Sequence, residues 1–337
     1  MKPILLDGSS GGGQMLRTAL SLAMITRRPF RMVHIRGKRS RPGLMRQHLA
    51  CVRAACEISG GTADGADIGS TEIVFRSHEI RPGSYQFAVG TAGSTSLILQ
   101  TLLPALWLAG GESSVTVEGG THNPLAPPFD FLDRVFLPAM AKLGATAGIH
   151  LLETGFAPAG GGAVRCDVLP CGGFQRADFT NRGALLGTKI RVPVRNLPQS
   201  IAGRVLDAAV AVCPCNDAAV ELREPGPGRG LACLVEAEFE HTREMTCSFG
   251  EQGVGEDKVG RRAGKLMSDF IGCGTAVGRH LADQLLLPLA LAGGGCFTTM
   301  APDDHLSTNA AVIRSFLDIT IDITELGHGQ WEVRLGS

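Results

Sequence analysis

Three short segments of the chain combine residue types that could bind or transfer a phosphate group. The first runs from Asp7 to Gln14 and reads Asp-Gly-Ser-Ser-Gly-Gly-Gly-Gln, between a predicted strand and a predicted helix. Glycines let backbone N–H groups approach an anion, and the N-terminus of a helix favours negative charge. The spacing matches neither a Walker loop nor a GxGxxG motif. A phosphate cradle and a plain strand–helix turn therefore both fit this segment.

The second segment is rich in cationic side chains and follows the glycine turn in the sequence. It extends from Arg36 to His48, while Arg17 lies on the preceding predicted helix. An arginine can bind two oxygens of one phosphate at once. The segment therefore predicts a site for a phosphate-bearing ligand or a nucleic acid, with a solvated basic loop as the alternative.

The third segment, Asp303-Asp304-His305, lies where a predicted strand meets a helix. An imidazole there can act as a nucleophile or base when a neighbour fixes its tautomer, or it can have a structural role. Asp283 lies at the start of another predicted helix, where it is a candidate cap or a candidate ligand for a divalent metal. The loop Gly119–Asp130 has prolines at a helix start, and it could also form one wall of a pocket.

The composition excludes some classes of protein without identifying one. The 337 residues include 32 Lys+Arg and 32 Asp+Glu, and 44% are hydrophobic. This apolar content argues against a disordered chain, and the glycines lack the three-residue period of collagen. Zero net charge does not indicate a nucleic-acid-binding protein, although a local basic patch can still bind a polyanion.

The sequence predicts a cytoplasmic protein. No apolar run reaches the roughly 18 residues that span a bilayer, and the N-terminus carries no recognisable secretory signal. The ten cysteines include no CxxC pair, which fits free thiols in a reducing compartment. We therefore expect no membrane partner, and the oligomeric state stays open.

A repeated pattern of apolar helix, glycine stop and strand must position these segments. Gln100-Thr-Leu-Leu-Pro104 and Gln284-Leu-Leu-Leu-Pro288 each lie in such a unit, and a looser third copy begins near Gln14. Each copy continues into another predicted helix and strand. Repeats of one supersecondary unit usually stack around a shared core. We therefore expect an α/β (α+β) fold whose large domain contains three βαβαββ-type modules.

About a hundred residues of different character separate the second module from the helices of the third. Loop signals flank this stretch at Asn181-Arg-Gly183 and Gly272-Cys-Gly274. We expect residues 181–275 to form a small α/β domain inserted before the third module's helices. The large domain then consists of residues 1–180 and 276–337.

Taken together, these segments resemble the RNA 3′-terminal phosphate cyclase family over nearly the whole chain. The motifs that carry the resemblance are Leu6-Asp7-Gly8, Gly11-Gly-Gly13-Gln14-Met-Leu-Arg17, Arg41-Pro-Gly-Leu-Met-Arg46-Gln47-His48-Leu49, Gly90-Thr-Ala-Gly93-Ser94, Gln100-Thr-Leu-Leu-Pro104, Gly119-Gly-Thr-His-Asn123-Pro-Leu-Ala-Pro127-Pro128, Phe156-Ala-Pro-Ala-Gly-Gly-Gly162, Leu281-Ala-Asp283-Gln284 and His305-Leu-Ser-Thr-Asn309. The resemblance implies three repeats like the C-terminal domain of translation initiation factor 3, with one inserted domain. That organisation agrees with the modules deduced from the repeats.

The resemblance also implies an ATP-dependent, ligase-type enzyme acting on RNA with a 3′-terminal phosphate. In that family's reaction, a histidine nitrogen attacks the α-phosphate of ATP and forms a covalent histidine–AMP. AMP then passes to the RNA 3′-phosphate, and the vicinal 2′-OH displaces it to leave a 2′,3′-cyclic phosphodiester. A divalent metal, Mg or Mn, and arginine side chains would offset the phosphate charge.

The family's functional positions carry over onto matching residues of this chain. The nucleophile corresponds to His305, and Asp283 is the candidate metal ligand. The ATP contacts correspond to Gln100, Pro127, Phe129, His280, Leu281, Ala282, Asp283 and Gln284, with Pro127 and Phe129 as adenine walls. The contacts to the RNA phosphate correspond to Arg17, Arg36, Arg39 and Gln47.

Two positions depart from the family pattern. The family usually has a metal-binding Glu just before Gly-Gly-Gly-Gln, but here the loop is two residues shorter and Ser10 occupies that place. A neutral hydroxyl is a weak metal ligand. Either Asp7 or Asp283 then supplies the charge, or metal-assisted adenylylation is impaired. The family also often has Tyr where this chain has His280, which alters stacking on the base.

Two other interpretations stay open. A non-catalytic cyclase-like protein of ribosome biogenesis would fit the Ser10 departure, but such relatives lack the nucleophilic histidine that matches His305. An enolpyruvyl-transferase-type enzyme has a comparable repeated α/β architecture, but it has no need for a histidine adenylate.

Overall fold

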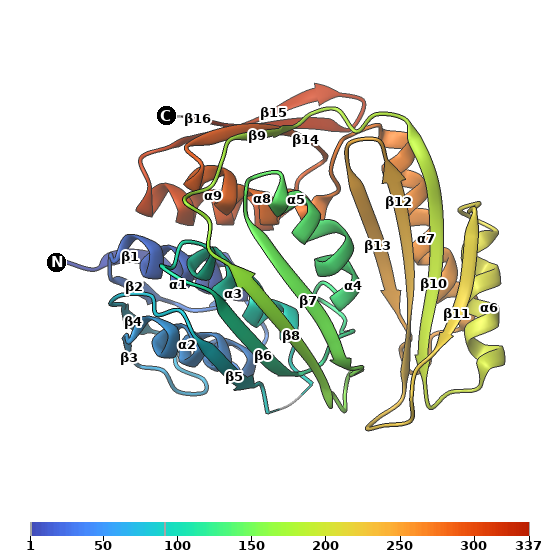
Figure 1. The fold of residues 1–337 in the computed structure, drawn as a ribbon, viewed down its shortest axis with the longest axis horizontal. Helices are drawn as coiled ribbons and strands as arrows, with labels where there is room; N and C mark the ends of the chain where they lie inside the picture. Colours follow the sequence, from blue (N-terminus) through green and yellow to red (C-terminus); the bar gives the residue numbers. More distant parts are fainter. Residues whose placement is uncertain (1, 91, 337) are drawn as a thin grey trace.

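The computed structural model describes residues 2–90 and 92–336 and arranges their strands in four four-stranded sheets. Three sheets belong to modules with the same order of elements, and the fourth belongs to a unit inserted into the third module (Figure 1). The predicted α/β class, the three βαβαββ modules and the place of the insertion are therefore confirmed.

The first module consists of β1 (Ile4–Asp7), α1 (Gly13–Thr26), β2 (Phe30–Val33), α2 (Arg46–Ser59), β3 (Thr62–Asp64) and β4 (Ile73–Arg76). Its sheet has the order β1-β2-β4-β3. The pair β1–β2 is parallel, and β4 runs antiparallel to both of its neighbours. The helix α1 thus connects two parallel strands, and the glycine turn lies between the end of β1 and the start of α1.

The second module repeats this topology with β5 (Ser84–Ala88), α3 (Thr95–Trp107), β6 (Ser113–Gly119), α4 (Phe129–Phe131), η1 (Leu132–Phe136), α5 (Leu137–Ala141), β7 (Thr146–Glu153) and β8 (Gly162–Leu169). The strand order is β5-β6-β8-β7. The helix that the repeated pattern predicts after β6 is not a regular α-helix, because its middle is a π-helical turn. Pro138 has no N–H to give to the carbonyl of Arg134, so regular α-helical bonding cannot continue there.

The third module consists of β9 (Ala177–Phe179), α8 (Arg279–Leu291), β14 (Gly294–Met300), α9 (Asp304–Phe316), β15 (Thr320–Gly327) and β16 (Gln330–Gly336). Its sheet, in the order β9-β14-β16-β15, again matches the topology of the first. Between β9 and α8 lies the inserted unit, which we define as β10 (Leu185–Arg195), α6 (Gln199–Val210), β11 (Asp217–Leu222), β12 (Gly230–Phe239), β13 (Arg243–Phe249) and α7 (Glu256–Cys273). Its sheet has the order β11-β10-β12-β13.

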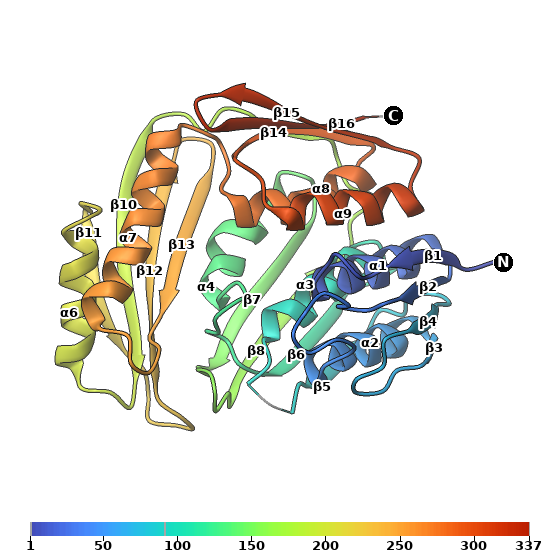
Figure 2. The same ribbon diagram turned by 180° about the vertical axis from the view of Figure 1, so that it is seen from behind.

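The helices of the three modules face one another at the centre of the molecule. Helix α1 packs against α3 and α9, and α8 packs against α9, while the sheets lie on the outside (Figures 1 and 2). The buried side chains of the modules join in one hydrophobic core. Segments at the ends of α1, α8 and α9 are thereby brought together although they are far apart in the sequence.

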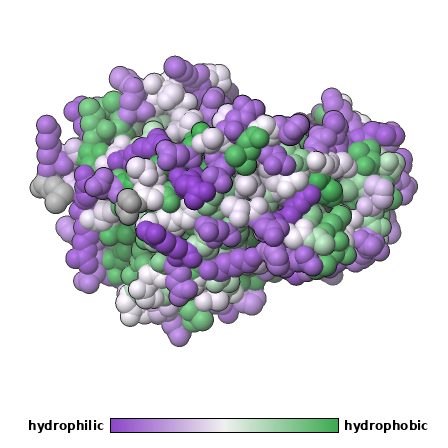
Figure 3. Space-filling view, turned by 90° about the horizontal axis from the view of Figure 1, so that it is seen from above, coloured by the Kyte–Doolittle hydropathy of each residue, from purple (hydrophilic) through white to green (hydrophobic). Residues whose placement is uncertain are grey.

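The inserted unit has a second core and also packs on the first. Ile190, Val192 and Val194 of β10 belong to a separate hydrophobic cluster with side chains of α6 and α7. Leu234 of β12 and Met245 of β13 belong instead to the core of the modules. The sheet therefore packs on its own helices with one face and on the modules with part of the other. From above, both parts present a mainly hydrophilic surface with scattered apolar groups (Figure 3).

None of the described helices is long and apolar enough to cross a membrane. All ten cysteines are free.

Candidate active site

His305 lies in the first turn of α9 with its side chain exposed. Asp303 caps this helix because its carboxylate accepts the backbone N–H of His305 at 2.9 Å. Such a cap satisfies one of the backbone donors that a helix leaves free at its start. The cap fixes the backbone of His305 and leaves the imidazole free to meet a ligand.

The glycine turn brings His305 and the basic loop to one point. A Cβ atom added to Gly12 would lie 3.4 Å from Arg39 Nη2 and 3.7 Å from His305 Cε1. Both side chains therefore flank the backbone of Gly12, one from the first module and one from the third. A cation and an imidazole beside an open strand–helix turn can together bind an anionic group.

Gly13, the next residue of the turn, is in close contact with His48 and Arg17. A Cβ atom there would lie 2.2 Å from His48 Nε2 and 3.1 Å from Arg17 Nη1. Burial and the charges of Arg17 and Arg36 lower the pKa of His48 to about 3. Its Nδ1 accepts the backbone N–H of Met45 at 3.0 Å, so a neutral His48 carries its proton on Nε2.

The remaining predicted RNA-phosphate contacts lie close to this cluster. The Arg36 guanidinium donates to the carbonyl oxygens of Arg41 and Gly43, so part of it shapes the loop. Gln47 donates to the carbonyl oxygen of Ser94 at 3.1 Å and is half-buried. Burial, followed by the charge of Arg39, lowers the pKa of Arg36.

Asp283 of α8 joins three helices. Its carboxylate accepts the side-chain amide of Gln14 from α1 and, at 3.1 Å, that of Asn309 from α9. Asn309 in turn accepts the hydroxyl of Thr18 at 2.7 Å. Burial raises the pKa of Asp283 to about 6, against the lowering effect of the Gln14 hydrogen bond and of nearby His305. These bonds fix the positions of α1, α8 and α9 around His305.

This arrangement does not fit a metal held by the protein. Both carboxylate oxygens of Asp283 already accept amide N–H groups. Across residues 2–90 and 92–336, no three His, Cys, Asp or Glu side chains are grouped to hold an ion. A divalent metal prefers several oxygen ligands. The metal role of Asp283 therefore stays a prediction.

The predicted nucleotide contacts on α3 and α8 include polar atoms without partners. Gln100 Nε2 and Gln284 Oε1 are buried and have no hydrogen bond within the described part of the chain. Each glutamine is also followed four residues later by a proline, Pro104 or Pro288, that cannot bond its backbone carbonyl. Buried orphaned donors and acceptors are uncommon in proteins. Their presence fits a ligand that offers both donors and acceptors, such as a purine nucleotide.

The other nucleotide candidates differ in exposure. Leu281 and Ala282 are almost fully buried in the core, so their side chains pack between helices. His280 is exposed one residue earlier. Pro127 is half-buried in the loop that follows β6, and Phe129, also half-buried, is the first residue of α4. Ser96 of α3 donates to the carbonyl oxygen of Pro127 at 2.7 Å, and this bond ties the loop to the same helix as Gln100.

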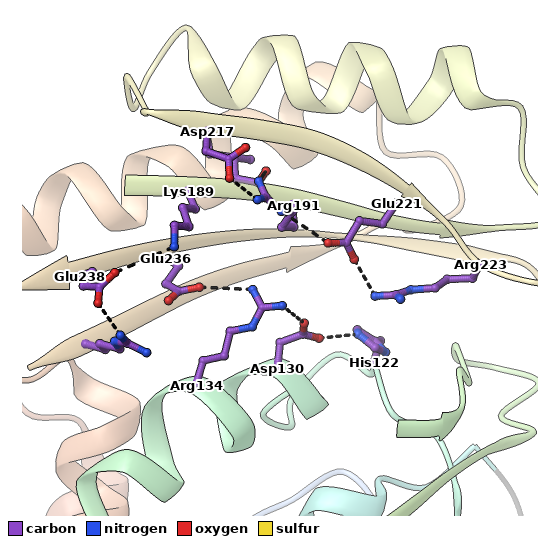
Figure 4. Close-up of polar contacts among 12 residues, drawn as sticks. His122, Asp130, Arg134, Lys189, Arg191, Asp217, Glu221, Arg223, Glu236 and Glu238 are labelled. Atoms are coloured by element: carbon purple, nitrogen blue, oxygen red, sulfur yellow. Dashed lines mark hydrogen bonds and ion pairs between the residues drawn. The ribbon is translucent and has the colours of Figure 1, made fainter. Parts of the chain in front are cut away.

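A buried polar network that the sequence did not reveal connects this loop to the inserted unit (Figure 4). His122 Nε2 lies 2.9 Å from Asp130 Oδ2, and Arg134 lies 3.5 Å from the other oxygen of Asp130. Arg134 also donates to Glu236 of β12 at 3.3 Å. The hydrogen bond to His122 and the charges of His122 and Arg134 outweigh burial and lower the pKa of Asp130. The network therefore fixes the loop against the inserted sheet.

Comparison with known proteins identifies the family of the chain. The family model described as RNA 3′-terminal phosphate cyclase matches residues 9–323. The chain is 47% identical to the RNA 3′-terminal phosphate cyclase of Ralstonia nicotianae, with 95% of this chain and 93% of the relative covered. It is 44% identical to that of Pseudomonas fluorescens, with 98% and 96% covered. The chain belongs to the RNA 3′-terminal phosphate cyclase family, as its motifs predict.

Proposed function

We propose that this protein is an ATP-dependent RNA 3′-terminal-phosphate cyclase that converts an RNA 3′-phosphate into a 2′,3′-cyclic phosphodiester. The observation that carries the proposal is the convergence of His305, Gly12 and Arg39. This places an exposed imidazole beside a cation and a turn suited to phosphate. Family membership supports the choice of substrates, because the curated relatives carry the name of this enzyme.

The first step of the proposed reaction is the adenylylation of His305. An imidazole nitrogen attacks the α-phosphorus of ATP, an N–P bond forms, and the P–O bond to pyrophosphate breaks. Gln100, Gln284 and His280 contact the nucleotide, with Pro127 and Phe129 beside the adenine. Arg39 offsets negative charge that the transition state gathers next to the imidazole. Mg or Mn bound to the phosphates of ATP, rather than to protein carboxylates, would offset part of their negative charge.

The second step transfers AMP from His305 to the RNA 3′-phosphate, so the N–P bond breaks and a phosphoanhydride forms. The vicinal 2′-OH then loses its proton and attacks the activated phosphorus, and AMP leaves as the cyclic diester closes. Closure within one molecule can reach effective molarities of about 10⁵–10⁸ M. Arg17, Arg36, Arg39 and Gln47 hold the terminal phosphate in this proposal.

The test is to incubate the protein with [α-³²P]ATP and a divalent metal. Wild-type protein should become labelled, and His305→Ala should lose the label. His78→Ala is a matched control because His78 is also exposed, and it should label like the wild type. Label that persists in His305→Ala would remove His305 as the nucleophile.

The alternative of a non-catalytic, RNA-binding relative rests on Ser10. If no protein becomes labelled under several metals but RNA still binds, this alternative replaces the enzymatic proposal. The variant Ser10→Glu tests whether the missing carboxylate at this position limits labelling. A higher labelling rate would show that a missing carboxylate limits the reaction, and an unchanged rate would show that it does not.

We further propose that residues 181–275 form a domain of their own, and that the protein acts in the cytoplasm. The separate core of the inserted unit supports the first proposal. Ten free cysteines, which suit a reducing compartment, support the second.

A further inference from the structure

The first module contains a long stretch without any acidic residue. From Gly8 to Cys56, 49 consecutive residues include ten Lys or Arg and no Asp or Glu. An even distribution of the 32 acidic residues over the 337 positions would place about five in this stretch. The zero net charge of the chain therefore hides a strong local excess of positive charge.

Some cations of this stretch are paired with carboxylates from other segments. Arg31 forms an ion pair with Glu72 at 2.7 Å, and Arg27 lies 3.8 Å from Glu79. Lys38, Arg41 and Arg46 are exposed, and within the described ranges no carboxylate lies within ion-pair distance of them. Most of the exposed, unmatched charge thus lies on the loop 36–46, and Arg53 of α2 adds one more exposed cation outside it.

This loop is a fixed structure. Gly43 donates its N–H to the carbonyl of Ile35 at 2.8 Å and closes the loop, and Leu44 donates to Ser70 at 2.9 Å. Lys38 donates its N–H to Ser9 at 3.2 Å, which ties the loop to the glycine turn. Cations on an ordered backbone lose less entropy when they bind than cations on a mobile segment.

The loop also begins at the reaction centre. Arg39 flanks Gly12 beside His305. Arg46, at the other end of the loop, is the exposed first residue of α2. Neighbouring like charges repel, and an anion bound along the loop would relieve that repulsion. Burial is the larger cause of the lowered pKa of Arg36, and the charge of Arg39 adds to it.

We infer that Lys38, Arg41 and Arg46 bind backbone phosphates of the RNA upstream of its 3′ end. The inference rests on the proposed function, because it extends the RNA site away from the terminal phosphate. These three cations contact phosphates rather than bases, so the surface favours longer RNA without selecting a sequence. The affinity of the protein for RNA therefore depends on the length of the RNA.

The experiment measures equilibrium binding by fluorescence anisotropy for two labelled RNAs with a 3′-phosphate, a ten-nucleotide strand and a dinucleotide. The triple variant Lys38→Ala/Arg41→Ala/Arg46→Ala should weaken binding of the longer strand by about tenfold or more at low salt and change dinucleotide binding less than twofold. The slope of log affinity against log salt should shrink by about 2, since each phosphate contact contributes about 0.7 on a single strand.

The matched control removes three exposed cations from α7 of the inserted unit, as Lys258→Ala/Arg261→Ala/Arg262→Ala, and should leave both affinities unchanged. Equal losses for both RNAs, or no loss for the longer one, would overturn the inference. Labelling with [α-³²P]ATP is measured on the same variants and should be unchanged. If the wild type is not labelled, the proposed function is wrong. The inference about the loop is still tested, because anisotropy measures RNA binding without catalysis.

Discussion

The carboxylate of Glu244 accepts the backbone N–H of Gly278 at 2.5 Å, directly before the first residue of α8. Its other oxygen accepts the N–H of Met245 at 3.0 Å. Glu244 is 2% exposed and belongs to β13 of the inserted unit. A negative charge at a helix N-terminus is favourable, so the inserted unit helps to hold the helix that carries His280, Asp283 and Gln284.

Glu244 should make the stability of the protein depend on pH. Burial raises the pKa of Glu244 to about 7 from an ordinary 4.5, so the native state binds more protons than the unfolded chain between these values. The free energy of unfolding therefore falls as the pH rises through this window, by on the order of 3 kcal/mol. Urea unfolding of wild type and Glu244→Gln at several pH values measures this term. A difference that stays constant from pH 5 to 8 would contradict it.

His48 should make the protein less stable as the pH falls, which is the opposite of the effect of Glu244. Its pKa of about 3 in the folded protein is depressed from an ordinary 6.5, so the unfolded chain takes up the proton first. The free energy of unfolding should fall as the pH drops from about 6.5 towards 3, by a few kcal/mol. In NMR spectra of the native protein, the His48 ring should remain the neutral Nε2–H tautomer at pH 5. A ring that becomes protonated near pH 6.5 would refute this expectation.

Gly13→Ala should destabilise the protein because the added methyl group has no room. Its Cβ would lie 2.2 Å from His48 Nε2, and His48 is buried and bonded to Met45. Overpacking of this kind costs about 1–3 kcal/mol. Gly203→Ala in α6 is the control, since nothing lies within 4 Å of its added Cβ; it should instead stabilise by about 0.5–1 kcal/mol. Thermal unfolding compares the two, and equal melting temperatures would rule out the close contact.

Asp130→Asn should cost more stability than Asp217→Asn (Figure 4). Asp130 has a side chain only 3% exposed and bonds to the buried His122. Removing its charge leaves His122 without a carboxylate partner, at a cost of about 3–5 kcal/mol. Asp217 pairs with Arg191 on a half-exposed surface, where an ion pair contributes roughly 0–1 kcal/mol. Chemical unfolding of both variants gives the two values. Similar losses would mean that the network around Asp130 does not support the loop.

Much of the fold was predictable because the apolar helices, glycine stops and strands recur in each module. The glycine turn, the basic loop and His305 were also accessible, since each is a compact motif at a strand–helix junction. The bounds of strand β7 are harder to predict because its residues alternate only between exposed and half-buried, which gives a weak pattern. Arg134 and Glu236 are 102 residues apart, and Glu244 meets Gly278 across 34 residues. Contacts of that kind depend on tertiary packing, which no local pattern records.

The position of the inserted unit has a consequence for synthesis on the ribosome. Phe179 of β9 pairs with Phe297 of β14, which is translated 118 residues later. At about 5–20 residues per second, β9 waits on the order of ten seconds for its partner. The first two modules can fold during this time. Of the third module's sheet, only the three-residue strand β9 has been translated. His305 therefore joins the candidate site only after the whole inserted unit has been translated.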